Sequence, residues 1–182
     1  MAHAAREAVY TVGHSTRPIA AFVELLAGCG IAALADIRTV PRSRYNPQYN
    51  AEALAPALAA AGIAYAAMPG LGGLRKPRAE SPNGGWRNDG FRGYADYMQT
   101  AAFETAIEAL VARAARERVA IMCAEAVPWR CHRSLVGDAL LVRGVQVIDI
   151  LSPGEQRPHT LTPFAVVHGT ALTYPPEQGS LL

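Results

Sequence analysis

Five short runs of apolar, β-prone residues are spaced along the chain. They comprise Val9–Val12, Ala33–Ile37, Ile63–Met68, Val119–Cys123 and Val145–Ile150. Each run is almost continuously hydrophobic and lacks the alternation of a half-exposed strand. Strands that are buried on both faces have this pattern, which is typical of parallel sheets covered by helices. The pattern therefore predicts a mainly parallel sheet of five strands.

Segments with helical spacing of apolar residues separate these runs. The predicted helices comprise Pro18–Cys29, Ala51–Ala61, Tyr94–Glu117 and Ser134–Arg143. Glycines follow the first, second and fourth segments, as is usual where helices end. The alternation of strands and helices predicts an α/β fold, and we favour a Rossmann-like three-layer sandwich. A partial β/α barrel is the alternative, because strand order is not encoded in the pattern.

The length of 182 residues fits one domain, and no repeat or low-complexity linker divides the chain. We therefore predict a single α/β domain over residues 1–182. Residues 69–93 form a long loop rich in glycine, proline and charge, which is either a lid or substrate-binding loop or a mobile surface insertion. Residues 151–182 form an irregular C-terminal extension that can add a short strand or a hairpin.

Composition narrows the class of protein without indicating a function. The hydrophobic fraction of 51% and the charged fraction of 18% are typical of a soluble globular protein. No apolar run has the length of a membrane span, and residues 1–7 lack the apolar core of a secretory signal. Three cysteines without framework spacing predict free thiols, a reducing compartment and hence the cytoplasm. The net charge of +2 is too small to argue for nucleic acid.

Polar or glycine-rich residues follow the predicted strands at their C-terminal ends. They comprise Gly13-His14-Ser15-Thr16, Asp36-Ile37-Arg38, Pro69-Gly70-Leu71-Gly72-Gly73, Cys123-Ala124-Glu125 and Asp149-Ile150. The carboxyl ends of parallel strands share one edge, and open α/β sheets bind ligands outside that edge. The sequence therefore predicts a shared pocket there.

The run from Cys123 to Arg133 carries two thiols in the loop between a buried strand and a helix. Cys131 lies near the predicted helix N-terminus, where backbone amides and the cation of Arg133 favour a thiolate nucleophile. The alternative is a cysteine that is merely packed, since buried free cysteines often act as small apolar residues. Packing is the favoured role for Cys123, and Cys29 is assigned a structural role.

Three further residues are candidates for proton transfer. Glu125 follows a buried strand and needs a partner such as Arg133 or Arg38, because an unpaired buried charge is costly. It is either a general acid or base or one half of a structural ion pair. His14 is a candidate base or anion donor, or else a histidine held by backbone groups. Asp36 either orients an imidazole or pairs with Arg38.

Arginines after the second strand predict an anion-binding loop. Arg38, Arg42 and Arg44, together with Ser43, resemble a cradle for phosphate, sulfate or carboxylate. A solvated loop in an arginine-rich chain is the alternative. The remaining ligand-binding candidates are Cys123, His132, Arg133 and Tyr94.

The sequence argues against the common cofactors. No Gly-x-Gly-x-x-Gly follows the first strand and no Walker-type phosphate loop occurs, which disfavours nicotinamide, flavin and nucleoside triphosphate cofactors. The spacing of Cys123, Cys131, His132 and His14 matches no structural zinc site. We therefore predict neither a cofactor nor a metal.

Several short motifs occur together and in order. They are Gly13-His14-Ser15, Asp36-x-Arg38-x-x-Pro41-x-Ser43-Arg44, Pro47-Gln48-Tyr49, Leu71-Gly72-Gly73, Phe91-x-Gly93-Tyr94-x-x-Tyr97-Met98, Cys123-Ala124-Glu125, Cys131-His132-Arg133 and Pro158-His159-x-Leu161-Thr162-Pro163. This set resembles the domain of unknown function 488 (DUF488) family over nearly the whole chain, from Tyr10 to about Ala165. The resemblance implies a small, soluble prokaryotic α/β protein with a shared pocket and without an established activity.

Two functions follow as expectations. The first is an enzyme that acts on a small anionic or nucleotide-like ligand, with Arg38, Arg42, Arg44 and Arg133 as the anion-binding residues. Glu125 and His14 would transfer protons, and Cys131 is the candidate nucleophile.

The second function is a non-catalytic module that binds a nucleotide or nucleic acid. Its arginines would contact phosphates, and aromatic residues would stack on bases: Tyr45, Tyr49, Trp86, Phe91 and Trp129. A polar cluster that only braces the loops is a third possibility. A membrane partner is not expected.

Overall fold

A six-stranded sheet runs through the computed structural model, which describes residues 8–177. Its strands are β1 (Ala8–Gly13), β2 (Ala33–Asp36), β3 (Ala64–Ala67), β4 (Val119–Cys123), β5 (Gln146–Ser152) and β6 (Glu155–Pro158). They lie in the order β3-β2-β4-β1-β5-β6, and the first five are parallel while β6 is antiparallel to β5. The predicted α/β class and mainly parallel sheet are confirmed. The sheet is open, with β3 and β6 at its edges, so the barrel alternative is wrong.

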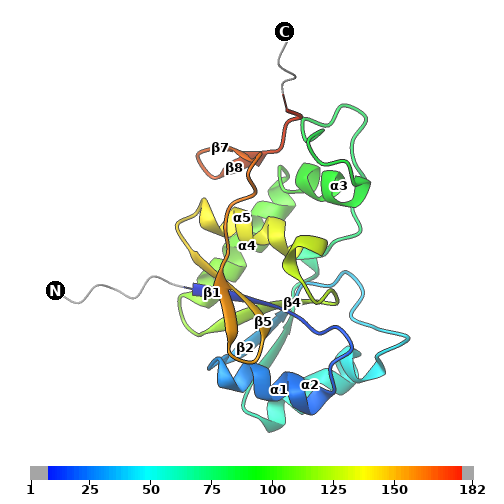
Figure 1. Ribbon diagram of the computed structural model, residues 1–182, viewed down its shortest axis with the longest axis vertical. Coiled ribbons are helices and arrows are strands. Elements are labelled where there is room, and N and C mark those ends of the chain that lie inside the picture. The colour runs from blue at the N-terminus through cyan, green and yellow to red at the C-terminus, as the bar shows by residue number, and fades with distance from the viewer. Residues whose placement is uncertain (1–7, 178–182) are drawn as a thin grey trace, which may run out of the picture.

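Helices cover both faces of this sheet (Figure 1). The helices α1 (Ile19–Gly28) and α2 (Ala51–Ala60) lie on one face, and α4 (Ala101–Ala114) and α5 (Arg133–Leu141) lie on the other. The short helix α3 (Asp89–Tyr97) packs with α4 and α5 and lies near a small hairpin of β7 (Val166–His168) and β8 (Ala171–Thr173). Three 3₁₀ segments occur in the loops: η1 (Pro47–Tyr49), η2 (Pro69–Leu71) and η3 (Pro128–Arg130).

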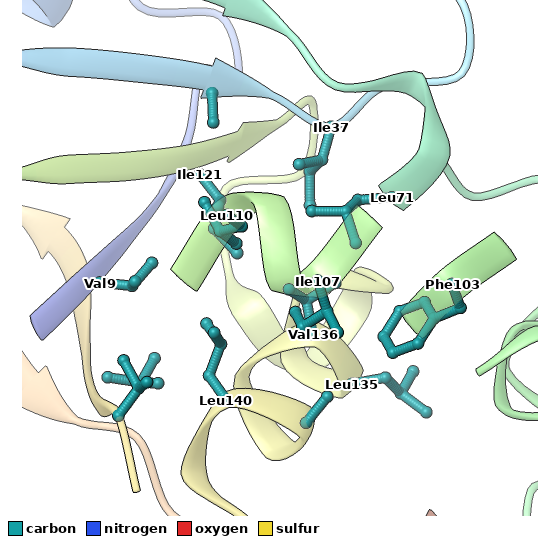
Figure 2. Close-up of a cluster of buried hydrophobic side chains, with 14 of the residues drawn as sticks. Val9, Ile37, Leu71, Phe103, Ile107, Leu110, Ile121, Leu135, Val136 and Leu140 are labelled. Carbon is teal, nitrogen blue, oxygen red and sulfur yellow. The ribbon is translucent and has the colours of Figure 1, made fainter. Parts of the chain in front are cut away.

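The sheet separates two buried apolar clusters. Alternate strand residues point to opposite faces, so Val9 and Ile121 join the cluster under α4 and α5, while Val12 and Met122 join the cluster under α1 and α2. Figure 2 shows the first cluster, in which Ile107 and other helix residues meet the strands. Because both faces are buried, each central strand is apolar at nearly every position, which is the pattern the sequence displays.

The predicted helix Tyr94–Glu117 is wrong in its extent: two helices, α3 and α4, occupy this part of the chain. The helical conformation is interrupted at Met98–Thr100. The Thr100 side chain there accepts a hydrogen bond from the Phe103 backbone N–H. This is an N-cap, which satisfies one of the free amides at the start of α4. Apolar spacing continues across the break because both helices pack on the same core.

The C-terminal extension contributes strands at two places. β6 turns back along β5 and widens the predicted five-stranded sheet to six strands. The β7–β8 hairpin lies apart from that sheet, and Tyr174, just after β8, is fully buried against α5. The extension is therefore packed onto the domain by its described residues.

The long loop of residues 69–93 is held against α3, which begins inside it at Asp89. The buried carboxylate of Asp96 accepts hydrogen bonds from the Arg78 backbone N–H, the Ser81 hydroxyl and the Asn83 side-chain amide. Burial alone would raise the pKa of Asp96, but these hydrogen bonds outweigh it and lower the pKa. A carboxylate with three donors is thus the anchor of this loop.

Replacing Ile107 by alanine tests the cluster under α4. Ile107 is fully buried, so truncation is expected to lower the free energy of unfolding by about 2–5 kcal/mol. Glu108 is its exposed neighbour on the same helix, and Glu108→Ala is expected to change stability by less than about 0.5 kcal/mol. Urea unfolding followed by circular dichroism measures both. Equal effects of the two substitutions would contradict the assignment of this face.

Candidate active site

The carboxyl ends of β1, β2 and β4 lie side by side, because β4 is between the other two strands. The side chain of His14 follows β1, those of Asp36 and Arg38 lie at the end of β2, and Cys123 ends β4. The predicted convergence of these residues on one edge is therefore present. Within it, the residues form two separate hydrogen-bonded groups.

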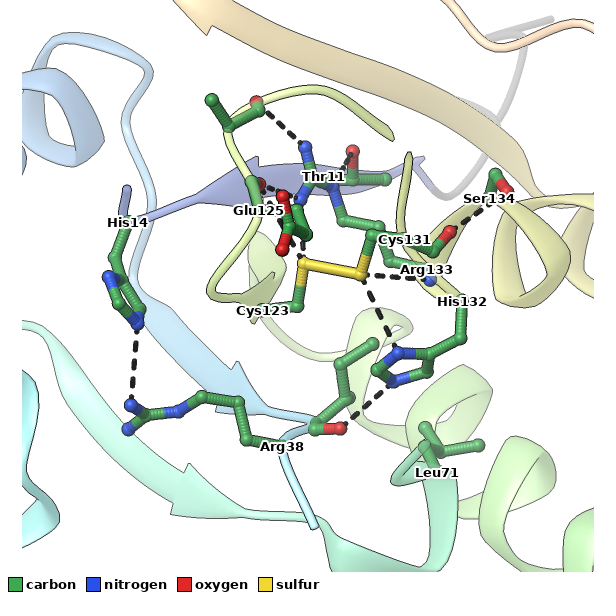
Figure 3. The surroundings of a disulfide bond; sticks show 12 residues. Thr11, His14, Arg38, Leu71, Cys123, Glu125, Cys131, His132, Arg133 and Ser134 are labelled. Carbon is green, nitrogen blue, oxygen red and sulfur yellow. Dashed lines mark hydrogen bonds between the residues drawn. A yellow bond between two sulfur atoms is a disulfide. The ribbon is translucent and has the colours of Figure 1, made fainter. Parts of the chain in front are cut away.

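The first group is built around a disulfide between Cys123 and Cys131 (Figure 3). Cys123 is the last residue of β4, and Cys131 lies between η3 and α5. The expectation of free thiols is not confirmed for this pair, and the free cysteine of the described residues is Cys29. Sequence spacing alone does not reveal such a pair, because the contact depends on the loop turning back on itself.

The ring of His132 has a fixed tautomer. Its Nε2 atom lies 3.1 Å from the Ile37 carbonyl oxygen, which can only accept, so Nε2 carries the proton. The unprotonated Nδ1 atom then faces the Cys131 sulfur at 3.5 Å (Figure 3). Burial lowers the pKa of His132 to about 4, and the nearby Arg133 charge acts in the same direction. His132 is therefore a neutral imidazole at neutral pH with a lone pair directed at sulfur.

Arg133, in the first turn of α5, is completely buried. Its Nη1 atom lies 2.7 Å from the Cys123 sulfur and also donates to the Glu125 carbonyl, and its Nη2 atom donates to the Ala126 carbonyl at 3.0 Å. Its Nε atom donates to the Thr11 hydroxyl at 3.4 Å. Burial lowers the pKa of Arg133 to about 10, so the side chain stays charged at neutral pH. Its hydrogen bonds are directed at the protein itself.

The second group consists of His14, Asp36 and Arg38. Arg38 donates through Nε and Nη2 to the Asp36 carboxylate and through Nη2 to the Tyr49 carbonyl. Its Nη1 atom lies 3.4 Å from Nε2 of His14, whose Nδ1 donates to the Ser15 carbonyl. Burial lowers the pKa of His14, and its ring is 2% exposed and stacked on Tyr49.

The hydroxyl of Tyr65 donates to the Asp36 carboxylate at 2.7 Å and completes this second group. Each charged or basic atom in the group thus has a partner inside the protein. These contacts connect the end of β1 with the end of β2. Of the two roles considered for Asp36, orienting an imidazole or pairing with Arg38, the structure shows the pairing with Arg38.

Other predicted residues lie elsewhere. Arg42 and Arg44 are exposed on the loop after β2, and the Ser43 hydroxyl accepts the Asn46 backbone N–H within that loop. They do not form one cradle with Arg38, whose guanidinium is bonded internally. The Glu125 carboxylate is exposed, and Arg133 reaches the backbone carbonyl of Glu125. Tyr94 is fully buried, donates to the Leu71 carbonyl and packs against the His132 ring.

A pocket of about 260 Å³ opens beside the disulfide. Cys131, His132, Glu125 and Arg130 line one side, and residues from both ends of the long loop line the rest: Gly73, Leu74, Asn88, Gly90 and Phe91. A Cβ atom on Gly73 would lie 2.9 Å from Nδ1 of His132, so only glycine leaves this ring its position. Both ends of the long loop therefore border this pocket, and its role in ligand binding stays a prediction.

Arg130 is not among the site residues predicted from the sequence. Arg130 nevertheless ends η3 exposed on the pocket wall. In the sequence, only its position next to Cys131 could have indicated Arg130 as a site residue. The direction of its side chain depends on the 3₁₀ turn η3, which the sequence does not reveal.

A buried polar chain extends from Arg133 to the C-terminal segment. The Thr11 hydroxyl donates to Asp149 on β5, and the His159 ring lies between Asp149 and Asp138 at 3.1 and 3.0 Å. Asp138 also accepts the Tyr174 hydroxyl at 2.9 Å. Burial alone would lower the pKa of His159, but hydrogen bonds to Asp138 and Asp149 outweigh it and raise the pKa to about 9. The sequence showed His159 in a motif without indicating these partners.

None of the helices in residues 8–177 has the length and apolar character needed to cross a membrane. Over the same residues, no three His, Cys, Asp or Glu side chains are grouped so that they could hold a metal ion.

The fold and the pocket define an open α/β protein with a cysteine pair at the carboxyl edge of its sheet. Residues 18–140 match the family model of domain of unknown function DUF488, which covers most of the chain. The chain therefore belongs to this family, as the resemblance of its motifs predicted. No curated protein and no solved structure matches it.

The raised pKa of His159 predicts a loss of stability with rising pH. The protonated ring is favoured in the folded state, so its contribution is fully present below about pH 6.5, the ordinary value, and is lost as the pH rises through about 9. Unfolding free energies measured between these pH values are expected to fall. The His159→Gln variant is expected to lose this slope, and an unchanged slope in that variant would contradict the assignment.

Proposed function

We propose that this protein is a cytoplasmic enzyme that acts on a small anionic ligand in the pocket above Cys131, with Cys131 as its nucleophile. The observation that carries the proposal is the 3.5 Å approach of the unprotonated Nδ1 of His132 to the Cys131 sulfur. In the reduced protein this nitrogen is placed to accept the thiol proton. A base within reach of a thiol is the usual means by which cysteine is activated.

The pocket suits a small ligand with a negative group. Its volume of about 260 Å³ is that of a compact metabolite rather than a polymer segment. Arg130 lines it with an exposed guanidinium that forms no hydrogen bond within residues 8–177, so the group is free to bind a carboxylate or phosphate. The exposed carboxylate of Glu125 on the same wall can accept a donor from the ligand.

The position of Cys123 favours thiol–disulfide exchange as the reaction. As the Cys131 sulfur attacks one sulfur of a small disulfide, the S–S bond of that ligand breaks, and His132 passes the Cys131 proton on to the leaving thiolate. Cys123 then attacks the Cys131 sulfur and releases the second ligand thiol, which takes the Cys123 proton. The two protein thiols are oxidised to the disulfide of Figure 3, and the ligand is reduced to two thiols.

The surroundings of both sulfur atoms support this exchange. The Arg133 guanidinium lies against the Cys123 sulfur, and the Arg133 backbone N–H lies 3.5 Å from the Cys131 sulfur, so each thiolate would have a donor. Two molecules of a small thiol reverse the reaction and restore the dithiol. In the cytoplasm, cysteine pairs of this kind are usually transient and catalytic.

Dithiobis(nitrobenzoate), an anionic disulfide, is the probe that tests the exchange. With Cys29 replaced by serine, the reduced protein is expected to release two equivalents of nitrothiobenzoate and to end unlabelled, two hydrogens lighter by mass spectrometry. In the Cys123→Ser variant the reaction is expected to stop at one equivalent, with the label on Cys131, because the resolving thiol is absent. Attachment of a stable label to Cys131 when Cys123 is present would exclude exchange.

The Cys131→Ser variant is the matched control for the order of attack. Cys131 lines the pocket and has the His132 ring beside it, whereas Cys123 does not line the pocket, so this variant is expected to react at least ten times more slowly. Equal rates for the two single variants would contradict the assignment of Cys131 as the attacking residue.

Alanine at His132 tests the base. Proton transfer by a positioned side chain contributes about 100-fold or more, so His132→Ala is expected to slow alkylation of reduced Cys131 by at least tenfold at about pH 7. The loss is expected to disappear near pH 10, where an ordinary thiol ionises without a base. The exposed His168 is the control, and His168→Ala is expected to react like the parent. A loss that persists unchanged at high pH would indicate a structural role.

A further inference from the structure

A second cavity of about 420 Å³ is lined by Pro128 and Trp129 of η3, whereas Arg130 of the same turn lines the pocket of Cys131. Its walls carry three aromatic side chains, Trp86, Trp129 and Phe164, and its polar lining includes Asp149 and His159. Both tryptophans of the protein therefore line this one cavity. The thiol chemistry proposed above uses none of these residues.

The aromatic walls differ in how firmly they are held. Trp86 is stacked on Phe91 with ring centres 4.8 Å apart and meets Phe164 edge-on at 4.9 Å. Trp129 is 61% exposed and takes part in no ring–ring contact within residues 8–177. An indole with a free face beside a fixed aromatic wall provides a stacking surface for a planar ring.

The polar lining selects the kind of ring. The Asp149 carboxylate accepts from Thr11 and from His159, and each of its oxygens keeps a further lone pair. The hydroxyls of Thr160 and Thr162 also line the cavity. A ring with an exocyclic amino group would donate to Asp149, whereas a negatively charged ring would be repelled by it.

Charge within the cavity is nearly balanced. His159 is held protonated between two carboxylates, and Arg157 at the wall is paired with Glu155 at 2.8 Å. Among the described residues that line the cavity, each cationic side chain is paired with a carboxylate, which leaves no free counter-ion for a strongly charged ligand. A neutral heteroaromatic amine meets the lining without an unpaired charge.

We propose that this cavity binds a planar, amino-bearing heteroaromatic ring of the size of a nucleobase, stacked on Trp129 and hydrogen-bonded to Asp149. Adenosine is the simplest probe of this class. The volume of about 420 Å³ lies within the range of small-ligand sites.

Isothermal titration calorimetry with adenosine and inosine tests the proposal. Adenosine is expected to bind saturably, and inosine, which has an oxo group in place of the amine, at least tenfold more weakly. Equal affinities would exclude recognition by Asp149, and the absence of saturable adenosine binding at millimolar concentration would overturn the proposal.

Substitution of Trp129 tests the stacking surface. Loss of base stacking in Trp129→Leu is expected to weaken adenosine binding at least tenfold, while Trp129→Tyr retains most of it. Tyr45 is 88% exposed on the loop after β2 and does not line the cavity, so Tyr45→Leu is the control that leaves binding unchanged. Unaltered binding by Trp129→Leu would contradict the proposal.

The Cys131→Ser variant separates the two proposals. It is expected to abolish the fast thiol reaction and to bind adenosine as the parent does. If adenosine does not bind, the proposed thiol chemistry is unaffected. If the thiol reaction does not occur, the proposed ligand of this cavity is unaffected.

Discussion

The buried guanidinium of Arg133 connects the strand ends on which the candidate site depends. Burying a charge is costly unless hydrogen bonds replace the water that it loses. Here the replacements come from three parts of the chain: Thr11 on β1, Cys123 at the end of β4, and the carbonyls of residues 125 and 126. The requirement to satisfy one cation thus sets the path of the loop that carries Cys131 and His132.

A series of buried charges of alternating sign connects Arg133 to the C-terminal segment. Arg133 lies near Asp149, Asp149 contacts His159, and His159 contacts Asp138, so opposite charges follow one another through the interior. Removing one member would leave its neighbours with uncompensated buried charge. The irregular segment after β6 is therefore attached to the sheet by ionic contacts as well as by apolar packing.

Much of the fold was predictable from the sequence, because burial on both faces leaves a continuous apolar run for each central strand. The interruption between α3 and α4 was not predictable. Apolar residues of both helices enter the same core, so the helical spacing of apolar residues continues through Thr100. In the site, the sequence located the edge of the sheet but not the partners of its residues. Arg38 and Arg133 were expected to bind a ligand, whereas their guanidinium groups bond to the protein.

The disulfide and the place of Arg130 depend on how the loop after β4 turns through η3, and no local pattern encodes that turn. His159 is a similar case, because its two carboxylate partners lie 10 and 21 residues away in the sequence. Contacts of this range arise from the assembled layers of the fold rather than from neighbouring residues.

The location of the two tryptophans has a spectroscopic consequence. Because Trp86 and Trp129 line the same cavity, the indole emission of this protein reports on one small region between α5 and the C-terminal segment. A local opening of that region would change the emission while the sheet stays intact. Tyrosine is distributed more widely, with Tyr10 and Tyr49 in the cluster under α1 and α2, so comparison of the two signals distinguishes local opening from global unfolding.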